Sequence, residues 1–184
     1  MKRKKMKLSG LFACAMLCLM TLSACTSIGN NSLATGNNSL AASDVTKVTC
    51  VYNFGSMDGA EMDVYTPDGT LTMYVIQPYS GSSVDLFAGE VPSEDECEIK
   101  ELTFTNDDWN SIVDAINKNN FMNLPEELPK VEADDGSSYY ITVETTSGTH
   151  KSGGYCAGNG IGNKHERFGE VKMLLYRLKS NKTK

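Results

Sequence analysis

The sequence contains few of the residues from which redox and metal sites are usually built. It has six cysteines, two histidines and one tryptophan in 184 residues, and no cysteine follows another at C-x-x-C spacing. Without a C-x-x-C pair, the usual signatures of thiol redox proteins and zinc knuckles are absent. No apolar run reaches the roughly 20 residues that a membrane-spanning helix needs. We therefore predict no metal, no cofactor and no transmembrane helix.

Basic residues are scarce in the middle of the chain. Residues 44–148 hold 21 acidic and four basic residues, whereas residues 149–184 hold eight basic and two acidic ones. A region with this excess of acidic residues disfavours nucleic acid as a partner, because the phosphates would repel it. We interpret the basic residues near the C-terminus as the solvated outer face of a helix.

The first 24 residues have the pattern of a secretory signal peptide. Residues 1–7 carry five bases and no acid, residues 8–22 are mostly apolar, and Ser23 and Ala24 are small. This order is typical of an exported chain. Removal of residues 1–24 would take the formal net charge from −6 to −11, because five bases and no acid are lost. Cys14 and Cys18 would leave with them.

The next residue extends this pattern. Leu22-Ser23-Ala24-Cys25 resembles the lipobox of bacterial lipoproteins at every position. The resemblance implies that diacylglycerol is attached to the sulfur of Cys25, which becomes the first residue of the mature chain. It also implies that acyl chains such as palmitate hold the protein on the extracytoplasmic face of the cell membrane. Two acyl chains hold a protein firmly, whereas one holds it only marginally. A secreted protein without lipid is the alternative.

Residues 25–44 are predicted to comprise the lipidated cysteine and a disordered linker. Gly-Asn-Asn-Ser-Leu-Ala occurs at residues 29–34 and again at 36–41. The seven-residue step suggests a coiled coil, but one leucine per step gives no apolar seam and Gly, Asn and Ser are poor helix formers. A single folded domain is predicted over residues 45–184.

The folded region is predicted to be an α+β domain with a mostly antiparallel sheet and two amphipathic helices packed on one face. β-Branched and aromatic residues or alternating polarity indicate strands at residues 47–54, 61–65, 71–76, 98–104, 138–144 and 149–155. The pattern also allows a short strand at 84–87. Residues 66–69, Thr-Pro-Asp-Gly, predict a hairpin turn.

Two segments have the periodicity of helices. Thr105 precedes two acids and an apolar stripe, Trp109, Ile112, Val113 and Ile116, so it is predicted to cap the first helix. Apolar residues at 168, 171, 174, 175 and 178 predict a C-terminal helix.

The order of these elements is similar to that of small uncharacterised bacterial lipoprotein domains. The resemblance rests on short motifs at residues 65–69, 102–105, 121–125, 135–140 and 152–155, and on the closing leucine-rich helix. It implies an architecture and carries no activity.

The most unusual stretch is the glycine-rich segment at residues 153–163. A glycine-rich backbone followed by a lysine and a helix start can bind an anion through exposed N–H groups. The residues predicted to bind a ligand here are Asn159, Asn163, Lys164 and His165. The Gly-Lys-Ser/Thr ending of a phosphate-binding loop is missing, and an ordinary loop is the alternative.

Other candidates have less support. Cys156 with His150 or His165 is the only combination that offers a thiol nucleophile and a base, and no peptidase signature surrounds it. Asp134 and Asp135 lack the ligand spacing of a calcium loop and are predicted to form a turn. Cys50, Cys97 and Cys156 leave any disulfide open to three pairings.

Together these features predict a membrane-anchored extracytoplasmic lipoprotein with a non-catalytic binding domain. Its expected partners are the membrane, through the lipid anchor, and an envelope protein, peptide or glycan. The alternative is a cell-envelope hydrolase that uses the glycine-rich loop with Cys156 and a histidine.

Overall fold

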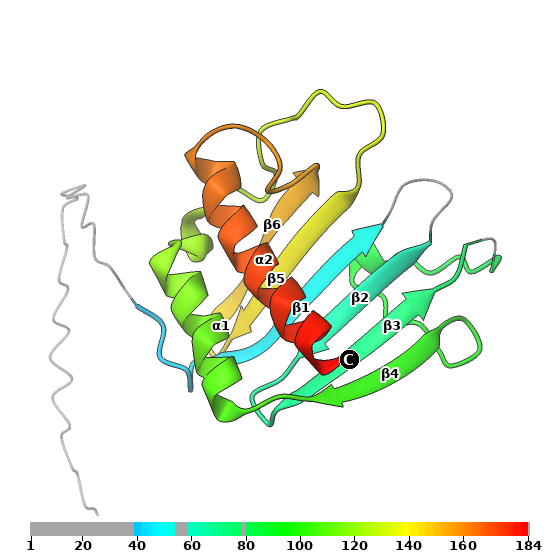
Figure 1. Ribbon diagram of the computed structural model, residues 1–184, viewed down its shortest axis with the longest axis horizontal. Helices are drawn as coiled ribbons and strands as arrows, with labels where there is room; N and C mark the ends of the chain where they lie inside the picture. Colours follow the sequence, from blue (N-terminus) through cyan, green and yellow to red (C-terminus); the bar gives the residue numbers. More distant parts are fainter. Residues whose placement is uncertain (1–38, 54–58, 79, 184) are drawn as a thin grey trace, which may run out of the picture. The chain divides into compact units, whose positions relative to one another are not determined.

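Six strands form one antiparallel sheet (Figure 1). In chain order they are β1 (Val45–Asn53), β2 (Ala60–Tyr65), β3 (Thr70–Ile76), β4 (Glu98–Thr103), β5 (Ser138–Thr145) and β6 (Gly148–Tyr155). Side by side, they follow the order β4-β3-β2-β1-β5-β6. The helices are α1 (Asn106–Lys118) and α2 (Asn163–Lys182), and two short 3₁₀ turns are η1 (Leu86–Ala88) and η2 (Phe121–Asn123). The predicted α+β class with an antiparallel sheet is confirmed.

The computed structural model describes residues 39–53, 59–78 and 80–183. The predicted signal peptide, the lipobox, Cys25 and most of the predicted linker lie outside these residues. Leu40, near the end of that linker, exchanges two hydrogen bonds with the Asn117 side chain, at 2.8 and 2.9 Å, and packs on the core. Among the described residues, no helix has the length and apolar character that crossing a membrane requires.

The hairpin of β2 and β3 forms at the predicted turn. The Thr66 N–H donates to the Thr70 carbonyl at 3.0 Å, and the Asp68 carboxylate accepts from the Thr70 N–H at the same distance. Gly69 has a φ of 88°, and an added Cβ would lie 2.6 Å from the Phe104 carbonyl oxygen. Both the backbone conformation and the close approach require glycine.

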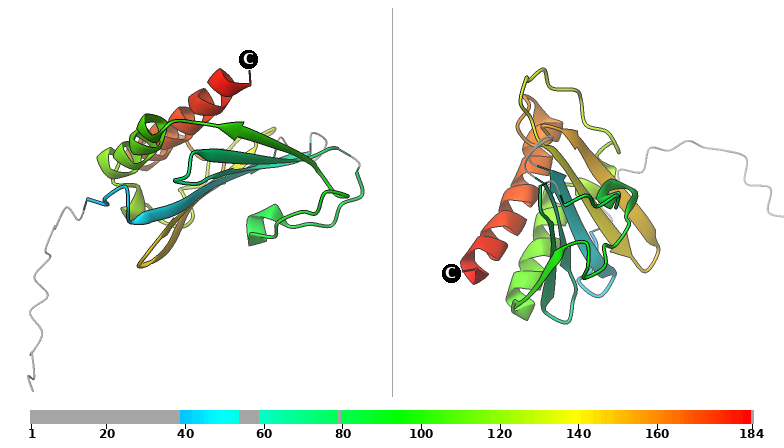
Figure 2. Two further views of the ribbon diagram at one scale, coloured as in Figure 1. Left: turned by 90° about the horizontal axis from the view of Figure 1, so that it is seen from below. Right: turned by 90° about the vertical axis from the view of Figure 1, so that its right-hand side faces the viewer.

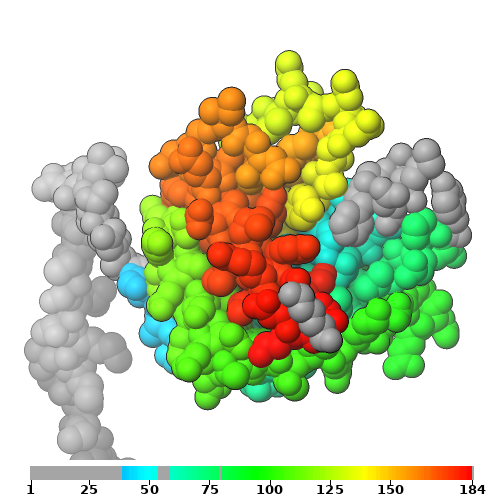
Figure 3. All heavy atoms as spheres, viewed as in Figure 1, coloured from blue at the N-terminus to red at the C-terminus, as the bar shows by residue number. Residues whose placement is uncertain are grey.

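Both helices lie over the same face of the sheet, here called the helix face (Figure 2). Thr105 caps α1, because its hydroxyl accepts from the Asp108 N–H while the Asp108 carboxylate accepts from the Thr105 N–H. The predicted stripe of Trp109, Ile112, Val113 and Ile116 is buried. In Figure 3, atoms of both helices lie over part of this face, and atoms of the β2–β4 region remain visible beside them. Each large apolar side chain buried there contributes about 1.5–3 kcal/mol to stability.

The opposite face, here called the open face, is crossed by the segment that contains η1 (Figure 2). Leu86 is buried there against Val51 and Met62. The short strand allowed at residues 84–87 is wrong. The Asp85 carboxylate accepts from the Phe87 and Ala88 N–H groups, and Gly89 ends the turn with a φ of 86°. This local capping bends the segment into a 3₁₀ turn, which packs on the sheet instead of joining it.

Candidate functional site

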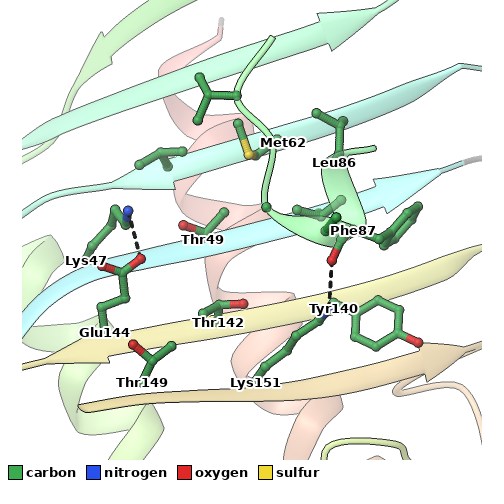
Figure 4. Close-up of a pocket in the computed structure, with 15 residues that line it drawn as sticks. Lys47, Thr49, Met62, Leu86, Phe87, Tyr140, Thr142, Glu144, Thr149 and Lys151 are labelled. Atoms are coloured by element: carbon green, nitrogen blue, oxygen red, sulfur yellow. Dashed lines mark hydrogen bonds and ion pairs between the residues drawn. The ribbon is translucent and has the colours of Figure 1, made fainter. Parts of the chain in front are cut away.

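A cavity of about 250 Å³ lies on the open face, between the strands and the η1 segment (Figure 4). Strand alternation explains its lining, because residues two apart point to the same face. The floor is formed by side chains from four strands: Lys47, Thr49 and Val51 of β1, Met62 and Val64 of β2, Tyr140, Thr142 and Glu144 of β5, and Thr149 and Lys151 of β6. Residues 86–89 and Val91 form the wall.

The cavity has an apolar side and a polar side. Val51, Met62 and Leu86 form the apolar side, and all three are buried. On the polar side, the Lys47 ammonium lies 2.7 Å from the Glu144 carboxylate, and both side chains remain partly exposed. Thr49 is directly opposite Thr142 in the strand register, so two hydroxyls lie side by side on the floor. An amphipathic ligand would match this division.

Two contacts of Phe87 attach the η1 segment to the sheet. The Lys151 ammonium donates to the Phe87 carbonyl at 2.8 Å and lies 4.5 Å from the centre of the Tyr140 ring. The Phe87 ring meets the Tyr140 ring edge-on, with centroids 5.5 Å apart. Desolvation and the hydrogen bond to Glu127 raise the pKa of Tyr140 to about 12. Tyr140 therefore stays protonated and donates to Glu127 at neutral pH.

The polar groups of this cavity belong to a few residue types. Its polar groups are threonine hydroxyls, one tyrosine, two lysines and one glutamate, and no histidine or cysteine lines it. A thiol nucleophile with an imidazole base is therefore missing from this site. Within the described residues, no group of three or more His, Cys, Asp or Glu side chains is placed to hold a metal ion.

The structure places the four predicted ligand-binding residues at the start of α2 and in the loop before it. His165 is only 2% exposed, its Nδ1 accepts from the Gly158 N–H at 3.3 Å, and its Nε2 lies 3.0 Å from the Pro129 carbonyl oxygen. Since Nδ1 accepts, Nε2 carries the proton and donates. Both ring nitrogens therefore serve to hold the loops together.

The other three residues do not converge on one point with His165. The Asn159 side-chain oxygen accepts from the Lys172 ammonium at 3.0 Å, and Lys172 also donates to the Ala157 carbonyl at 2.9 Å. Burial lowers the pKa of Lys172. Asn163 and Lys164 are exposed in the first turn of α2, which begins at Asn163. These contacts fix the shape of the loop, and Lys164 is left facing solvent.

The thiol candidate, Cys156, is buried and 6% exposed. The hydrogen bonds of His165 engage both of its nitrogens, and His150 packs edge-on against Phe121 with ring centroids 5.7 Å apart. Burial lowers the pKa of His150. Cys50, Cys97 and Cys156 are free thiols. This arrangement does not present a thiol and a base together to a substrate.

A buried charge cluster on the helix face was missed by sequence reasoning. Lys179 of α2 contacts the carboxylates of Glu61 and Asp63 and the hydroxyl of Tyr52, with the Asp63 contact at 3.1 Å. Burial raises the pKa of Asp63 to about 7, and Glu61 adds to this while Lys179 opposes it. Burial lowers the pKa of Lys179, but the two carboxylates outweigh it and the pKa rises. Two carboxylates thus share one ammonium, and the Asp63 carboxyl takes up a proton below about pH 7.

The alternating polar and apolar residues of β2 include two of the acids of this cluster. Residues 61 and 63 alternate with the apolar residues 62 and 64, which suggests a solvated face. Both faces of β2 are in fact covered, and Glu61 and Asp63 are buried. Their partner is more than 110 residues away in sequence, so no local pattern joins them.

Comparisons with known proteins give no family for this chain. No model of a protein family matches the sequence, and no curated protein matches it.

Proposed function

We propose that this chain is a lipoprotein, anchored through Cys25 to the extracytoplasmic face of the cell membrane, whose domain binds an envelope component in the open-face cavity. The proposal is supported from two sides. The sequence of residues 1–25 combines a signal peptide pattern with a complete lipobox. The domain offers a partly apolar cavity with a polar rim.

The observation that carries the binding role is the contrast between the two faces. We take both helices to be amphipathic, closing the helix face with their apolar sides. Among the residues that the structure describes, the segment that contains η1 lies over the open face, and the cavity remains beside it. A ligand would approach from this side and contact Thr49, Thr142 and the Lys47–Glu144 pair.

The test uses two matched tryptophan substitutions in the full chain. Thr142→Trp places an indole on the cavity floor, whereas Thr103→Trp places one on an exposed position of β4 outside the cavity. Each variant is compared with the wild type in capturing components from envelope extracts, and captured molecules are identified by mass spectrometry. We expect Thr142→Trp to lose a component that the wild type and Thr103→Trp retain. Equal capture by all three proteins would refute the cavity as the binding site.

A further inference from the structure

The outer edge of β6 carries main-chain groups that point away from the sheet. The Gly153 N–H donates to the Glu126 carbonyl at 3.0 Å, and the Gly153 carbonyl accepts from the Leu128 N–H at 2.8 Å. Gly153 therefore directs both groups away from β5. The register of β5 and β6 runs without interruption, so Thr149 and Lys151 direct their groups the same way. In the described part of the chain, no hydrogen bond reaches these groups.

One segment of the chain already pairs with this edge through its main-chain groups. Residues 126–128 pair with Gly153 in a short parallel bridge. They add one extended segment to the edge. Because the bridge is parallel, the preceding residue, Pro125, lies toward Lys151, and its carbonyl accepts from the Ser152 hydroxyl at 2.7 Å. A second extended segment, in line with the first, would meet the same alternating N–H and C=O groups. The outward N–H and C=O groups recur every second residue, about every 7 Å along the strand. An extended peptide presents its own N–H and C=O groups at the same spacing.

The free part of the edge adjoins the cavity. The side chains of Thr149 and Lys151 lie on the open face and line the cavity, while their main-chain groups face outward. A strand that pairs here would project alternate side chains onto the open face, beside those of Thr149 and Lys151. The edge would bind the backbone, and the cavity would select one side chain. This is the division of roles found in β-strand addition.

We propose that the ligand of this domain is an extended peptide that pairs with the outer edge of β6 at Thr149 and Lys151 and extends one side chain toward the cavity. This inference rests on the proposed binding role of the cavity. Val51 and Met62 lie on β1 and β2, and β5 separates both strands from β6, so this side chain would meet the near rim of the cavity at Thr149 and Lys151. The exposed acids Glu126 and Glu127 lie at the next edge position. They favour a neutral or basic peptide over an acidic one.

The other edge of the sheet is built differently. The Phe104 N–H donates to the Gly69 carbonyl at 2.8 Å, so Phe104 directs its main-chain groups toward β3. Because this direction alternates along a strand, Glu101 and Ile99 direct their main-chain groups outward. Charged side chains at Glu98, Lys100 and Glu101 crowd this strand, and all three are exposed. Charges on an edge strand oppose pairing with another chain. β4 therefore serves as the control edge.

Peptide selection tests the inference directly. A display library of random peptides about seven residues long is selected against the purified full chain in detergent micelles, with empty micelles as the background. Affinities of the enriched peptides are then measured for Thr149→Pro and for Glu101→Pro. Each substitution removes one outward N–H from an edge strand, where proline is tolerated.

We expect Thr149→Pro to weaken binding roughly tenfold or more, whereas Glu101→Pro leaves it unchanged. Hydrogen exchange on the wild type gives a reading that does not depend on the variants. Peptide should slow exchange of the Thr149 and Lys151 amides and leave the Glu101 amide unaffected. No enriched peptide, or enriched peptides without this protection, would overturn the inference.

Two further outcomes separate this inference from the proposed function. If the edge amides become protected when the protein is concentrated without peptide, the edge pairs with a second copy and the peptide proposal is wrong. If no peptide is selected but Thr142→Trp still abolishes capture of an envelope component, the cavity binds another class of molecule. The proposed function would then stand without the peptide.

Discussion

Replacing Asp63 with asparagine is expected to change how the stability of the domain depends on pH. Asp63 is 3% exposed, and its carboxylate lies 3.1 Å from the Lys179 ammonium, which Glu61 also contacts. Asparagine has nearly the same shape and can still accept from Lys179 through its carbonyl oxygen. The substitution thus removes one titrating group and keeps the packing.

The magnitude follows from the pKa. Burial raises the pKa of Asp63 from 3.8 to about 7. Because the folded pKa is above the unfolded one, the contribution to stability is full below about pH 4 and is lost as the pH rises to about 7. Between these two pH values, the unfolding free energy should fall by on the order of 4 kcal/mol. Relaxation of the residues around Asp63 makes the fall smaller. Asp63→Asn should lack this slope and should be at least as stable as the wild type above pH 7.

Urea denaturation between pH 4.5 and 8, followed by the fluorescence of Trp109, measures the effect. The quantity to compare is the difference in unfolding free energy between the wild type and Asp63→Asn at each pH. Asp68→Asn is the control, because hydrogen bonds from Thr66 and Thr70 lower the pKa of Asp68 and its small contribution has the opposite sign. A difference for Asp63→Asn that stays constant with pH would refute the reasoning.

Three further predictions concern single side chains. Lys179→Met should lower the unfolding free energy by about 3–5 kcal/mol at pH 8, because two buried carboxylates lose their cation. The loss should be smaller at pH 5, where Asp63 is protonated. The same urea denaturation series measures both values. Thr105→Ala should cost about 1 kcal/mol through loss of the α1 cap, measured at one pH. Maleimide labelling of the folded chain followed by mass spectrometry should modify Cys97 well before Cys156, which is buried; equal rates would show that the segment around Cys156 opens readily.

Local sequence patterns were sufficient for most of the secondary structure. Alternating polarity and β-branched residues located the six strands to within a few residues. Five of the strands bury residues on at least one face, whereas β4 is mostly exposed. The capping hydroxyl of Thr105 and the stripe from Trp109 to Ile116 located α1. These signals lie within one element, so they can be read without knowing its neighbours.

The predictions from sequence were wrong or incomplete where contacts between distant elements determine the structure. Residues 84–87 look like a strand, but the Asp85 cap and the packing of Leu86 on Val51 and Met62 form η1 instead. The cavity depends on strands β1, β2, β5 and β6, and it forms because β1 pairs with β5, a strand far away in the sequence. His165 looked available for a ligand, but Pro129 and Gly158 engage its ring.

The anchor at Cys25 is the claim on which the proposed location depends, and mass spectrometry of the native chain tests it most directly. The protein is extracted from its own membranes and its N-terminal peptide is analysed. We predict that this peptide begins at Cys25 and carries a diacylglycerol adduct on its sulfur. A chain that begins at another residue, or a Cys25 without any acyl adduct, would contradict it.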